Sequence, residues 1–288
     1  MATTAVAGPA ARLQIAQYLV ALQKRAGLKG TEVARRAGCG TSTVTRYMDW
    51  RTTARLTVPM VRAIADACGA SGVERDRLAE LVSVLEDGWQ LDDPGVPEWM
   101  DPLVSLEGVA EYIDAYACAL VPGLLQIPEY ALAMYQARGA DLEESKRKVA
   151  ARIRRQDVLQ RDDLHLHVVL AESVLRWVVG GPDVMRAQID HLREMMDRPH
   201  IDLRVLPYTA GASAAGSGGN FMILGRDGRD GDPAPFTMTV VYLELHARGL
   251  YLDAPADTDA YRVTFSSLQD QAADDSAGAL AAARKEFQ

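Results

Sequence analysis

The sequence predicts an α+β protein in which an N-terminal all-α, five-helix domain precedes an α+β domain with a small, mainly antiparallel sheet. Three observations predict this class. Apolar residues follow helical spacing through the first 85 residues, a Gly-Cys-Gly turn interrupts that region at 38–40, and strands alternate with helices beyond residue 105. The expected organisation is a tail at 1–11, a helix-turn-helix domain at 12–86, a linker at 87–104 and an effector domain at 105–288.

The first domain should contain five helices, which we expect near 12–24, 31–37, 41–48, 57–68 and 71–85. Thr31 is expected to cap the second helix, because a threonine side chain can accept a hydrogen bond from a free N–H of the first turn. Gly27 and Gly69 stand where glycines end helices. Ser71 with Glu74 has the spacing of a capping box.

The second domain shows a mixed pattern. We expect helices near 109–120, 128–138, 143–160, 182–197, 257–269 and 276–286, and strands near 164–170, 201–206, 221–224, 237–245 and 250–252. The last two strands should form a hairpin around 247–249. The segment 211–219 is rich in glycine, alanine and serine, which predicts a mobile loop or a flexible lid over a groove.

Charge is distributed unevenly along the chain. The net charge is −8, but residues 12–62 contain ten basic and two acidic residues, so this window carries +8 and the remainder −16. A basic segment on an acidic body is typical of a protein that presents one end to nucleic acid. No apolar run approaches the ~20 residues that span a bilayer, and three widely spaced cysteines fit a reducing cytoplasm.

The span 31–51 has the order helix, glycine turn, helix, in which the second helix presents its N-terminal residues to base edges of double-stranded DNA. The expected base-reading side chains are Thr41, Ser42, Thr43, Thr45 and Arg46. The expected phosphate contacts are Arg35, Arg36, Arg51 and Arg55, and Thr31 is included among the DNA contacts. The alternative interpretation of the third helix is a polar, solvated face without a ligand.

Residues 12–85 resemble the helix-turn-helix domains of the xenobiotic-response-element class (Cro/C1-repressor-like). The residues that carry this resemblance are 22–28 (LQKRAGL), 33–38 (VARRAG) and 42–46 (STVTR). The chain departs from that class at Lys29, Thr41 and Met48. Because the class often has glutamine where Thr41 stands, its adenine contact is not carried over to this position.

The remainder resembles the effector domain of WhiJ-like actinobacterial regulators, such as those of Streptomyces. The matching motifs are 120–126 (LVPGLLQ), 129–131 (EYA), 152–159 (RIRRQDVL), 179–182 (VGGP), 205–212 (VLPYTAGA) and 241–244 (VYLE). The resemblance implies a DNA-binding repressor or developmental regulator, often encoded beside a small acidic partner protein. We expect a homodimer that binds an inverted repeat, with a partner protein or small-molecule effector on the second domain.

Other chemistry receives less support from the sequence. His165 and His167 share one strand face, as two metal ligands can, but no third ligand has an informative spacing. No nucleophile motif or cofactor-binding motif is present, so we expect neither an enzyme nor a bound cofactor. The basic run 146–155 could be a second nucleic-acid surface or, as we expect, a solvated helix face. The alternative function is a protein-interaction module, either antitoxin-like or a scaffold for a small partner.

Overall fold

The computed structural model describes residues 9–50, 56–83, 89–91, 102–216, 218–227, 238–245, 249–273 and 275–287. The chain divides into two compact units. The first comprises Met1–Val109, Arg226–Val240 and Leu245–Thr258, and the second comprises Ala110–Gly225, Val241–Glu244 and Asp259–Gln288. The predicted boundaries at residues 86 and 105 stay a prediction.

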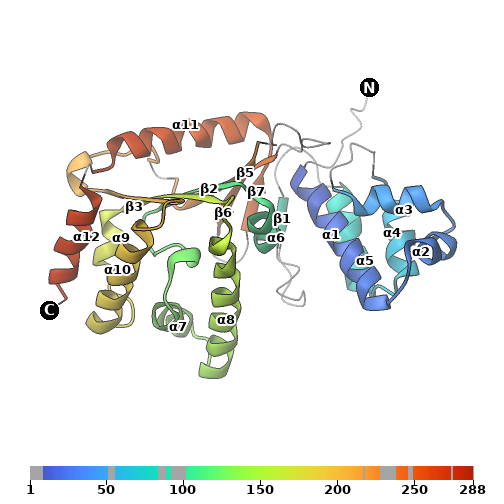
Figure 1. Cartoon of the computed structure of the whole chain (residues 1–288), viewed down its shortest axis with the longest axis horizontal. Helices are drawn as coiled ribbons and strands as arrows, with labels where there is room; N and C mark the ends of the chain where they lie inside the picture. The colour runs from blue at the N-terminus through green and yellow to red at the C-terminus, as the bar shows by residue number, and fades with distance from the viewer. Residues whose placement is uncertain are drawn as a thin grey trace. The chain divides into compact units, whose positions relative to one another are not determined.

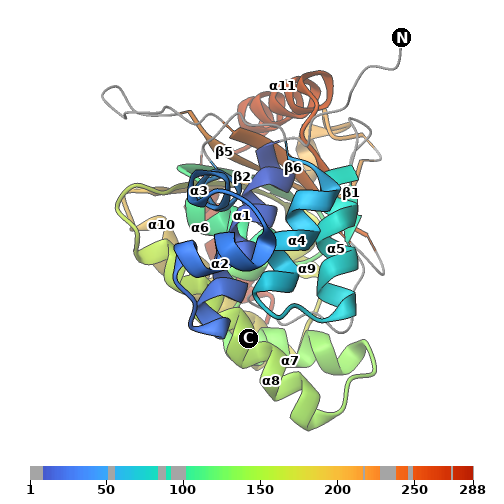
Figure 2. The ribbon, with the colours of Figure 1, turned by 90° about the vertical axis from the view of Figure 1, so that its right-hand side faces the viewer.

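Five helices of the first unit form one bundle, coloured blue to cyan in Figure 2. They are α1 (Pro9–Ala26), α2 (Gly30–Ala37), α3 (Thr41–Met48), α4 (Val58–Ala67) and α5 (Gly72–Ser83). Each lies within a few residues of its predicted position. Their fully buried side chains include Leu13, Leu19, Leu22, Ile64 and Leu78. This apolar core holds the bundle together, because buried area is the dominant favourable term in folding.

Local signals placed most of these helix ends correctly. Gly27 and Gly69 have positive φ angles of 65° and 75°. The capping box is confirmed, because the Ser71 N–H donates to Glu74 Oε2 at 2.7 Å and the Glu74 N–H donates to Ser71 Oγ at 3.3 Å. The prediction that Thr31 caps the second helix was wrong.

The backbone explains this error. Helix α2 begins at Gly30, and Lys29 occupies the cap position without a side-chain hydrogen bond. Its carbonyl accepts the N–H groups of Glu32 and Val33, which places Thr31 inside the first turn. Helix α1 begins at Pro9, three residues before the predicted start, since proline is tolerated in a first turn. Residues 9–11 of the predicted tail are therefore helical.

Seven strands of the described residues form one sheet, with the order β1-β7-β6-β5-β2-β3-β4. The strands are β1 (Trp89–Leu91), β2 (Tyr112–Ala117), β3 (His165–Ala171), β4 (Ile201–Leu206), β5 (Phe221–Arg226), β6 (Met238–Glu244) and β7 (Gly249–Leu252). Antiparallel pairs join β1 to β7 and β2 to β5, while β2, β3 and β4 run parallel. The α+β class is confirmed, and the parallel strands are an addition to the predicted pattern.

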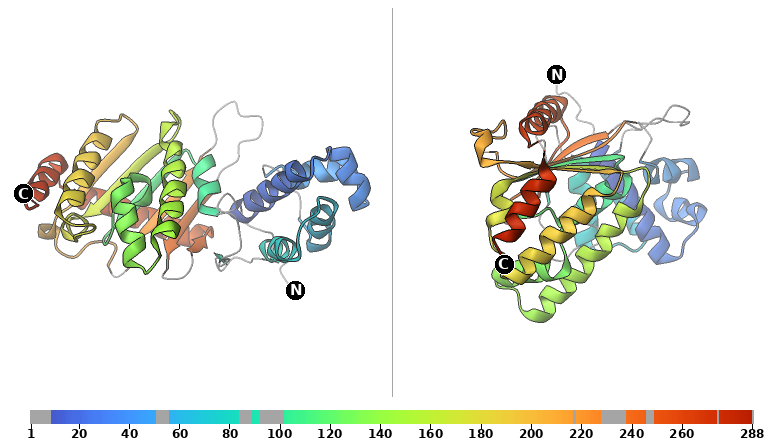
Figure 3. Two further views of the ribbon diagram at one scale, coloured as in Figure 1. Left: turned by 90° about the horizontal axis from the view of Figure 1, so that it is seen from below. Right: turned by 60° about the vertical axis from the view of Figure 1, so that its left-hand side comes forward.

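The other described helices and 3-10 turns lie between these strands or follow the last of them. They are α6 (Pro102–Val109), η2 (Gly123–Leu125), α7 (Pro128–Ala137), α8 (Leu142–Arg155), η3 (Gln156–Gln160), α9 (Glu172–Arg176), α10 (Pro182–Met196), η4 (Tyr208–Ala210), α11 (Pro255–Gln271) and α12 (Ser276–Lys285). Figures 1 and 3 show α11 along one face of the sheet and α7, α8 and α10 on the side of the other face. Phe221 of β5 meets Tyr261 and Phe265 of α11 edge-on, which fixes that helix on its face.

One prediction in the second domain was wrong, and a second was right only in part. The segment 109–120 was expected to be a helix, but α6 ends at Val109 and residues 112–117 form β2. This strand lies between β3 and β5, so pairing on both edges overrides its helix-compatible apolar spacing. The expected long helix at 143–160 ends as an α-helix at Arg155 and tightens into η3, because Gln156 bonds to a neighbouring turn.

Candidate DNA-binding interface

The turn between α2 and α3 depends on Gly38. Its φ of 68° is left-handed, which glycine adopts without the steric penalty that a side chain would impose. The Cys39 N–H then donates to the Ala34 carbonyl at 3.0 Å, which closes the helix in the manner of a Schellman motif. Gly40 has an extended backbone, and its carbonyl accepts hydrogen bonds from the N–H groups of Thr43 and Val44. This turn aims α3 away from α2, as a helix-turn-helix unit requires.

Helix α3 has one buried side and one exposed side. Val44 and Tyr47 are buried, and the Tyr47 hydroxyl accepts the Thr57 N–H at 3.2 Å, which ties α3 to the start of α4. Four predicted base-reading side chains are exposed, namely Thr41, Ser42, Thr45 and Arg46, while Thr43 is half-buried. The structure therefore displays the polar residues of α3 on the side opposite its anchor.

Two contacts organise the exposed side of α3. The Thr45 hydroxyl donates to the Thr41 carbonyl at 3.1 Å, so its methyl and hydroxyl groups are oriented by the helix itself. Arg46 Nη2 lies 3.5 Å from Thr43 Oγ1, which is a weak and long hydrogen bond. Because that contact is weak, the Arg46 guanidinium can turn toward a guanine edge or a phosphate at little cost.

Helix α2 carries two of the four residues that are predicted to contact phosphates. Arg35 and Arg36 are both exposed, and Arg36 forms an i,i+4 ion pair with Glu32 at 2.7 Å. An exposed pair of this kind is worth about 0.3–0.5 kcal/mol, so a phosphate can replace Glu32 readily. Thr31 is exposed at the N-terminal turn of α2. Arg51 and Arg55 lie outside the described residues.

Sequence reasoning missed one ion pair that braces this bundle. Arg25 of α1 makes two hydrogen bonds to the Glu74 carboxylate, at 2.6 and 2.9 Å. The hydrogen bond from Arg25, with those from Ser71, lowers the pKa of Glu74 to about 2. The capping-box spacing had identified Glu74 as a cap, but its pairing with a residue 49 positions earlier had no local signal.

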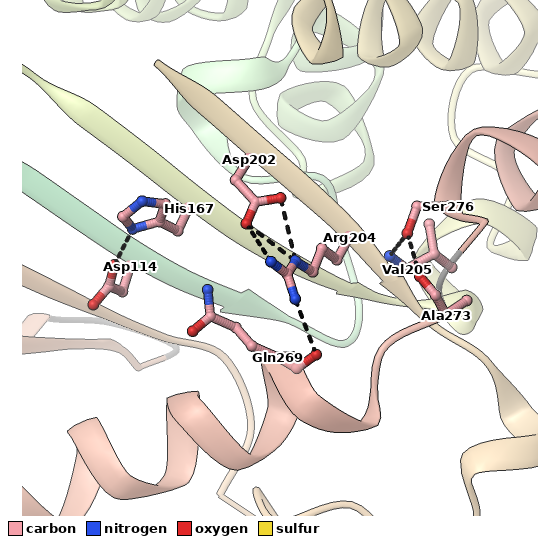
Figure 4. A network of polar contacts seen from close by, with 8 residues as sticks. All are labelled: Asp114, His167, Asp202, Arg204, Val205, Gln269, Ala273 and Ser276. Atoms are coloured by element: carbon pink, nitrogen blue, oxygen red, sulfur yellow. Dashed lines mark hydrogen bonds and ion pairs between the residues drawn. The ribbon is translucent and has the colours of Figure 1, made fainter. Parts of the chain in front are cut away.

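Among the described residues, the two histidines of β3 do not belong to a cluster of side chains that could bind a metal ion. His167 Nδ1 lies 2.7 Å from Asp114 Oδ1 on β2, and this hydrogen bond raises the pKa of His167 (Figure 4). His165 is exposed and its ring lies 6.5 Å from that of His167. Within the part of the chain that the structure describes, no three His, Cys, Asp or Glu residues could hold a metal ion.

The same sheet face continues into β4. Arg204 pairs with Asp202 on its own strand and donates to the Gln269 carbonyl of α11 at 3.4 Å (Figure 4). At the edge of β4, the Val205 N–H donates to Ser276 Oγ and its carbonyl accepts the Ala273 N–H. These bonds occupy backbone groups that an edge strand would otherwise expose.

A buried polar network in the second unit was also missed. Gln126 Nε2 donates to the Val121 carbonyl at 2.7 Å, and Gln126 Oε1 accepts Arg152 Nη1 at 2.5 Å. Gln156 donates to the carbonyls of Gly123 and Gln126. The network joins two segments, 120–126 and 152–159, that the resemblance to WhiJ-like regulators had singled out separately. Gln126, a glutamine within an apolar run, was the available signal.

Helix α8 is only partly the solvated face that its charge spacing predicted. Lys146 pairs with Glu143 at 2.9 Å and Lys148 with Glu144 at 2.5 Å, as helical spacing implies. Arg152 instead turns inward toward Gln126.

The turn, the anchored α3 and the exposed polar side together define the class of this chain: a helix-turn-helix DNA-binding protein of the regulator type. The comparison with known families agrees, since a family model described as a helix-turn-helix domain matches residues 14–78. A second model, described as a domain of unknown function (DUF5753), matches residues 100–280. The chain therefore belongs to the DUF5753 family. No curated protein and no solved structure matches it.

Across the described ranges, none of the helices is both long enough and apolar enough to cross a bilayer.

Proposed function

We propose that this chain is a sequence-specific transcription regulator of the xenobiotic-response-element class that reads operator DNA with α3. The observation that carries the proposal is the division of α3 into an anchored side, with Val44 and Tyr47 buried, and an exposed side ending in Thr45 and Arg46. A merely solvated helix needs no hydroxyl and guanidinium groups at the positions that enter a major groove.

The proposed regulator is WhiJ-like. Its DNA-binding domain comprises 12–86, its effector domain comprises 105–288, and the segment 87–104 connects them. It acts as a homodimer on an inverted repeat, with half-sites about 34–36 Å apart. The effector domain senses a small acidic partner protein or a small-molecule effector, and this binding changes operator affinity. Such coupling requires an effector that binds the DNA-competent and DNA-free states with different affinity.

The test begins with an operator identified by genomic pull-down and sequencing. Fluorescence anisotropy then compares wild type with Thr45→Ala and Arg46→Ala. Each lost base contact is worth about 1–3 kcal/mol, so we expect specific affinity to fall about 5- to 150-fold while non-specific binding changes less. Arg75→Ala on α5 is the matched control, because Arg75 is paired with Asp66 away from α3.

Unchanged specific affinity in both α3 variants would contradict the recognition-helix assignment. Pull-down that recovers a partner protein but no discrete genomic sites would favour the interaction module instead. The slope of log affinity against log salt is an independent measurement: a slope near zero would contradict phosphate contacts from α2.

A further inference from the structure

The second unit presents two exposed aromatic side chains, Trp177 and Tyr208, whose exposed fractions are 62% and 60%. Every other tryptophan, tyrosine or phenylalanine side chain that the structure describes is buried or half-buried. Val178, which follows Trp177, is exposed as well. Large apolar side chains that gather on a surface often mark a place where another molecule packs. We call Trp177, Val178 and Tyr208 the aromatic patch.

The strand order brings the members of the aromatic patch to one end of the sheet. Because β3 and β4 are parallel neighbours, their carboxyl ends lie side by side, with Ala171 opposite Leu206. Helix α9 follows β3 and is capped by Trp177, and the turn η4 follows β4 and begins at Tyr208. The topology therefore gathers at one edge two aromatic residues that are distant in the sequence.

One carboxylate links the two turns that carry the aromatic patch. Glu172 Oε2 accepts the Tyr208 N–H at 2.8 Å, and Glu172 Oε1 accepts Arg176 Nη2 at 2.7 Å. The hydrogen bond from Tyr208, followed by that from Arg176, lowers the pKa of Glu172, so the carboxylate stays ionised at neutral pH. Because Arg176 directly precedes Trp177, the link holds both aromatic residues in one arrangement.

The turn that carries Trp177 has a defined backbone. The Trp177 N–H donates to the Ser173 carbonyl at 3.0 Å, which closes α9. The chain then passes through Gly180 and Gly181, which have positive φ angles of 72° and 91°. A Cβ atom built on Gly180 would stand 3.0 Å from the Val184 side chain, so the turn requires glycine there. A surface that is already ordered loses little conformational entropy when a partner covers it.

The charged groups that contact the turns of the aromatic patch are paired within the chain. Arg176 forms ion pairs with both Glu172 and Glu286. A strongly acidic or strongly basic partner therefore finds no excess of the opposite charge in these groups. They are compatible with a second copy of this chain, because two identical surfaces repel each other only where one sign of charge is in excess.

The size of the aromatic patch also fits a contact between two copies. The exposed parts of its three side chains amount to roughly 300 Å², because a whole aromatic side chain buries about 150–250 Å². Two copies together would bury roughly 600 Å² of apolar surface, which is about half of the ~1,200 Å² of a small stable interface. The centre of an interface is apolar and rich in tryptophan and tyrosine, whereas its rim is polar, so this fraction is the one expected for a centre.

We propose that the aromatic patch is the centre of a two-fold symmetric interface between two copies of this chain, with Trp177 of one copy packed on Tyr208 of the other. In such an interface the same surface serves both copies, so the contact between these two residues occurs twice. This interface rests on the proposed binding of a homodimer to an inverted repeat, and it names the surface that holds the two copies together.

The experiment measures the mass and the dissociation constant of the full-length chain by sedimentation velocity over a range of micromolar concentrations. We expect a dimer with twice the 31.3 kDa mass of the chain. Trp177→Lys and Tyr208→Glu should each weaken the dimer at least about tenfold, because buried tryptophan and tyrosine anchors dominate interface energetics. Val263→Glu is the matched control and should leave the dimer unchanged, since Val263 is an exposed apolar residue of α11 outside the patch. Circular dichroism checks that each variant is folded.

A mixture of Trp177→Lys with Tyr208→Glu tests the proposed pairing itself. In a mixed dimer the introduced lysine faces the introduced glutamate, and the remaining Trp177 faces the remaining Tyr208. We expect the mixture to form dimers at concentrations where neither variant does so alone. Such recovery requires that the two positions meet across the interface, and a variant that had merely lost its fold would not show it.

Three outcomes overturn the interface: a wild-type chain that stays monomeric, variants that dimerise as tightly as wild type, or a mixture that recovers no dimer. The first includes the case in which a different protein covers the patch. Operator affinity is measured separately. Loss of the dimer in Trp177→Lys with unchanged affinity for an inverted repeat would support the interface and contradict dimeric operator binding. Thr45→Ala and Arg46→Ala change only α3 and leave the sedimentation result untouched, so the two proposals fail distinguishably.

Discussion

The arginines of α2 and α3 and the arginine at the end of α8 carry the same charge in opposite settings. Arg35, Arg36 and Arg46 are exposed, so water solvates them and their existing contacts are weak. Arg152 is turned inward, bonded to Gln126 and stacked on Tyr135. The exposed cations are suited to phosphates that arrive from solvent, whereas the enclosed cation depends on a specific neutral acceptor.

This difference shows that the number of basic residues in a segment does not tell whether that segment binds an anion. Helix α8 is rich in Lys and Arg, yet Lys146 and Lys148 are used in helical ion pairs. The environment of each cation decides its role, because the free energy of a charge depends on hydration far more than on its sequence neighbours. Three variants can break or sharpen the comparison.

The largest expected effect belongs to Gln126→Leu. This change removes the acceptor of Arg152 Nη1 and the donor to the Val121 carbonyl, so two buried polar groups lose a partner. We expect a loss of about 2–4 kcal/mol in the free energy of unfolding, measured by urea denaturation. Arg152→Met should cost less than about 1 kcal/mol, because it removes the buried charge itself. If Gln126→Leu is as stable as wild type, Arg152 is not held by this amide.

An intermediate effect is expected for Glu74→Gln, in the helix-turn-helix bundle. The pKa of Glu74 is lowered from 4.5 to about 2 when folded, so its pairing with Arg25 contributes fully above pH 4.5 and is lost as pH falls through about 2. The variant should be less stable than wild type by about 1 kcal/mol at pH 7. That difference should shrink toward pH 2.

Asp76→Asn provides the control for this pH dependence, because Asp76 pairs with Arg62 at an exposed position of the same helix. We expect its effect at pH 7 to stay below about 0.5 kcal/mol. A stability difference between wild type and Glu74→Gln that does not change between pH 7 and pH 2.5 would contradict the assigned pairing. Urea denaturation at each pH supplies the measurement.

The smallest effect is expected for Lys146→Ala on α8. Its ion pair with Glu143 is exposed on both sides, at 56% and 73% of each side chain, so solvent screens it. Thermal unfolding should show a change of less than about 0.5 kcal/mol. A loss above 1 kcal/mol in the free energy of unfolding would show that Lys146, like Arg152, makes stabilising contacts outside its own helix. The difference between an exposed and an enclosed cation on α8 would then not hold.

Local rules predicted the helical bundle well and the sheet less well. The capping box at Ser71 and Glu74, the left-handed glycines and the short α3 all depend on neighbours a few residues apart, so the sequence contains the information. Strand β2 depends on β3 and β5, which follow it by about 50 and 110 residues. Its pairing partners are not visible in a local window, and its apolar spacing was compatible with a helix.

The candidate site divides in the same way. The sequence by itself determined which α3 residues are polar and which apolar, because Val44 and Tyr47 must face the core and Thr41, Ser42 and Thr45 are then exposed. It also determined the uneven charge along the chain. Only the tertiary structure decided that Arg152 points inward to Gln126, 26 residues earlier, while its neighbours on α8 stay in solvent. Burial of a charge results from packing between distant segments, and periodicity along one helix carries no information about its partners.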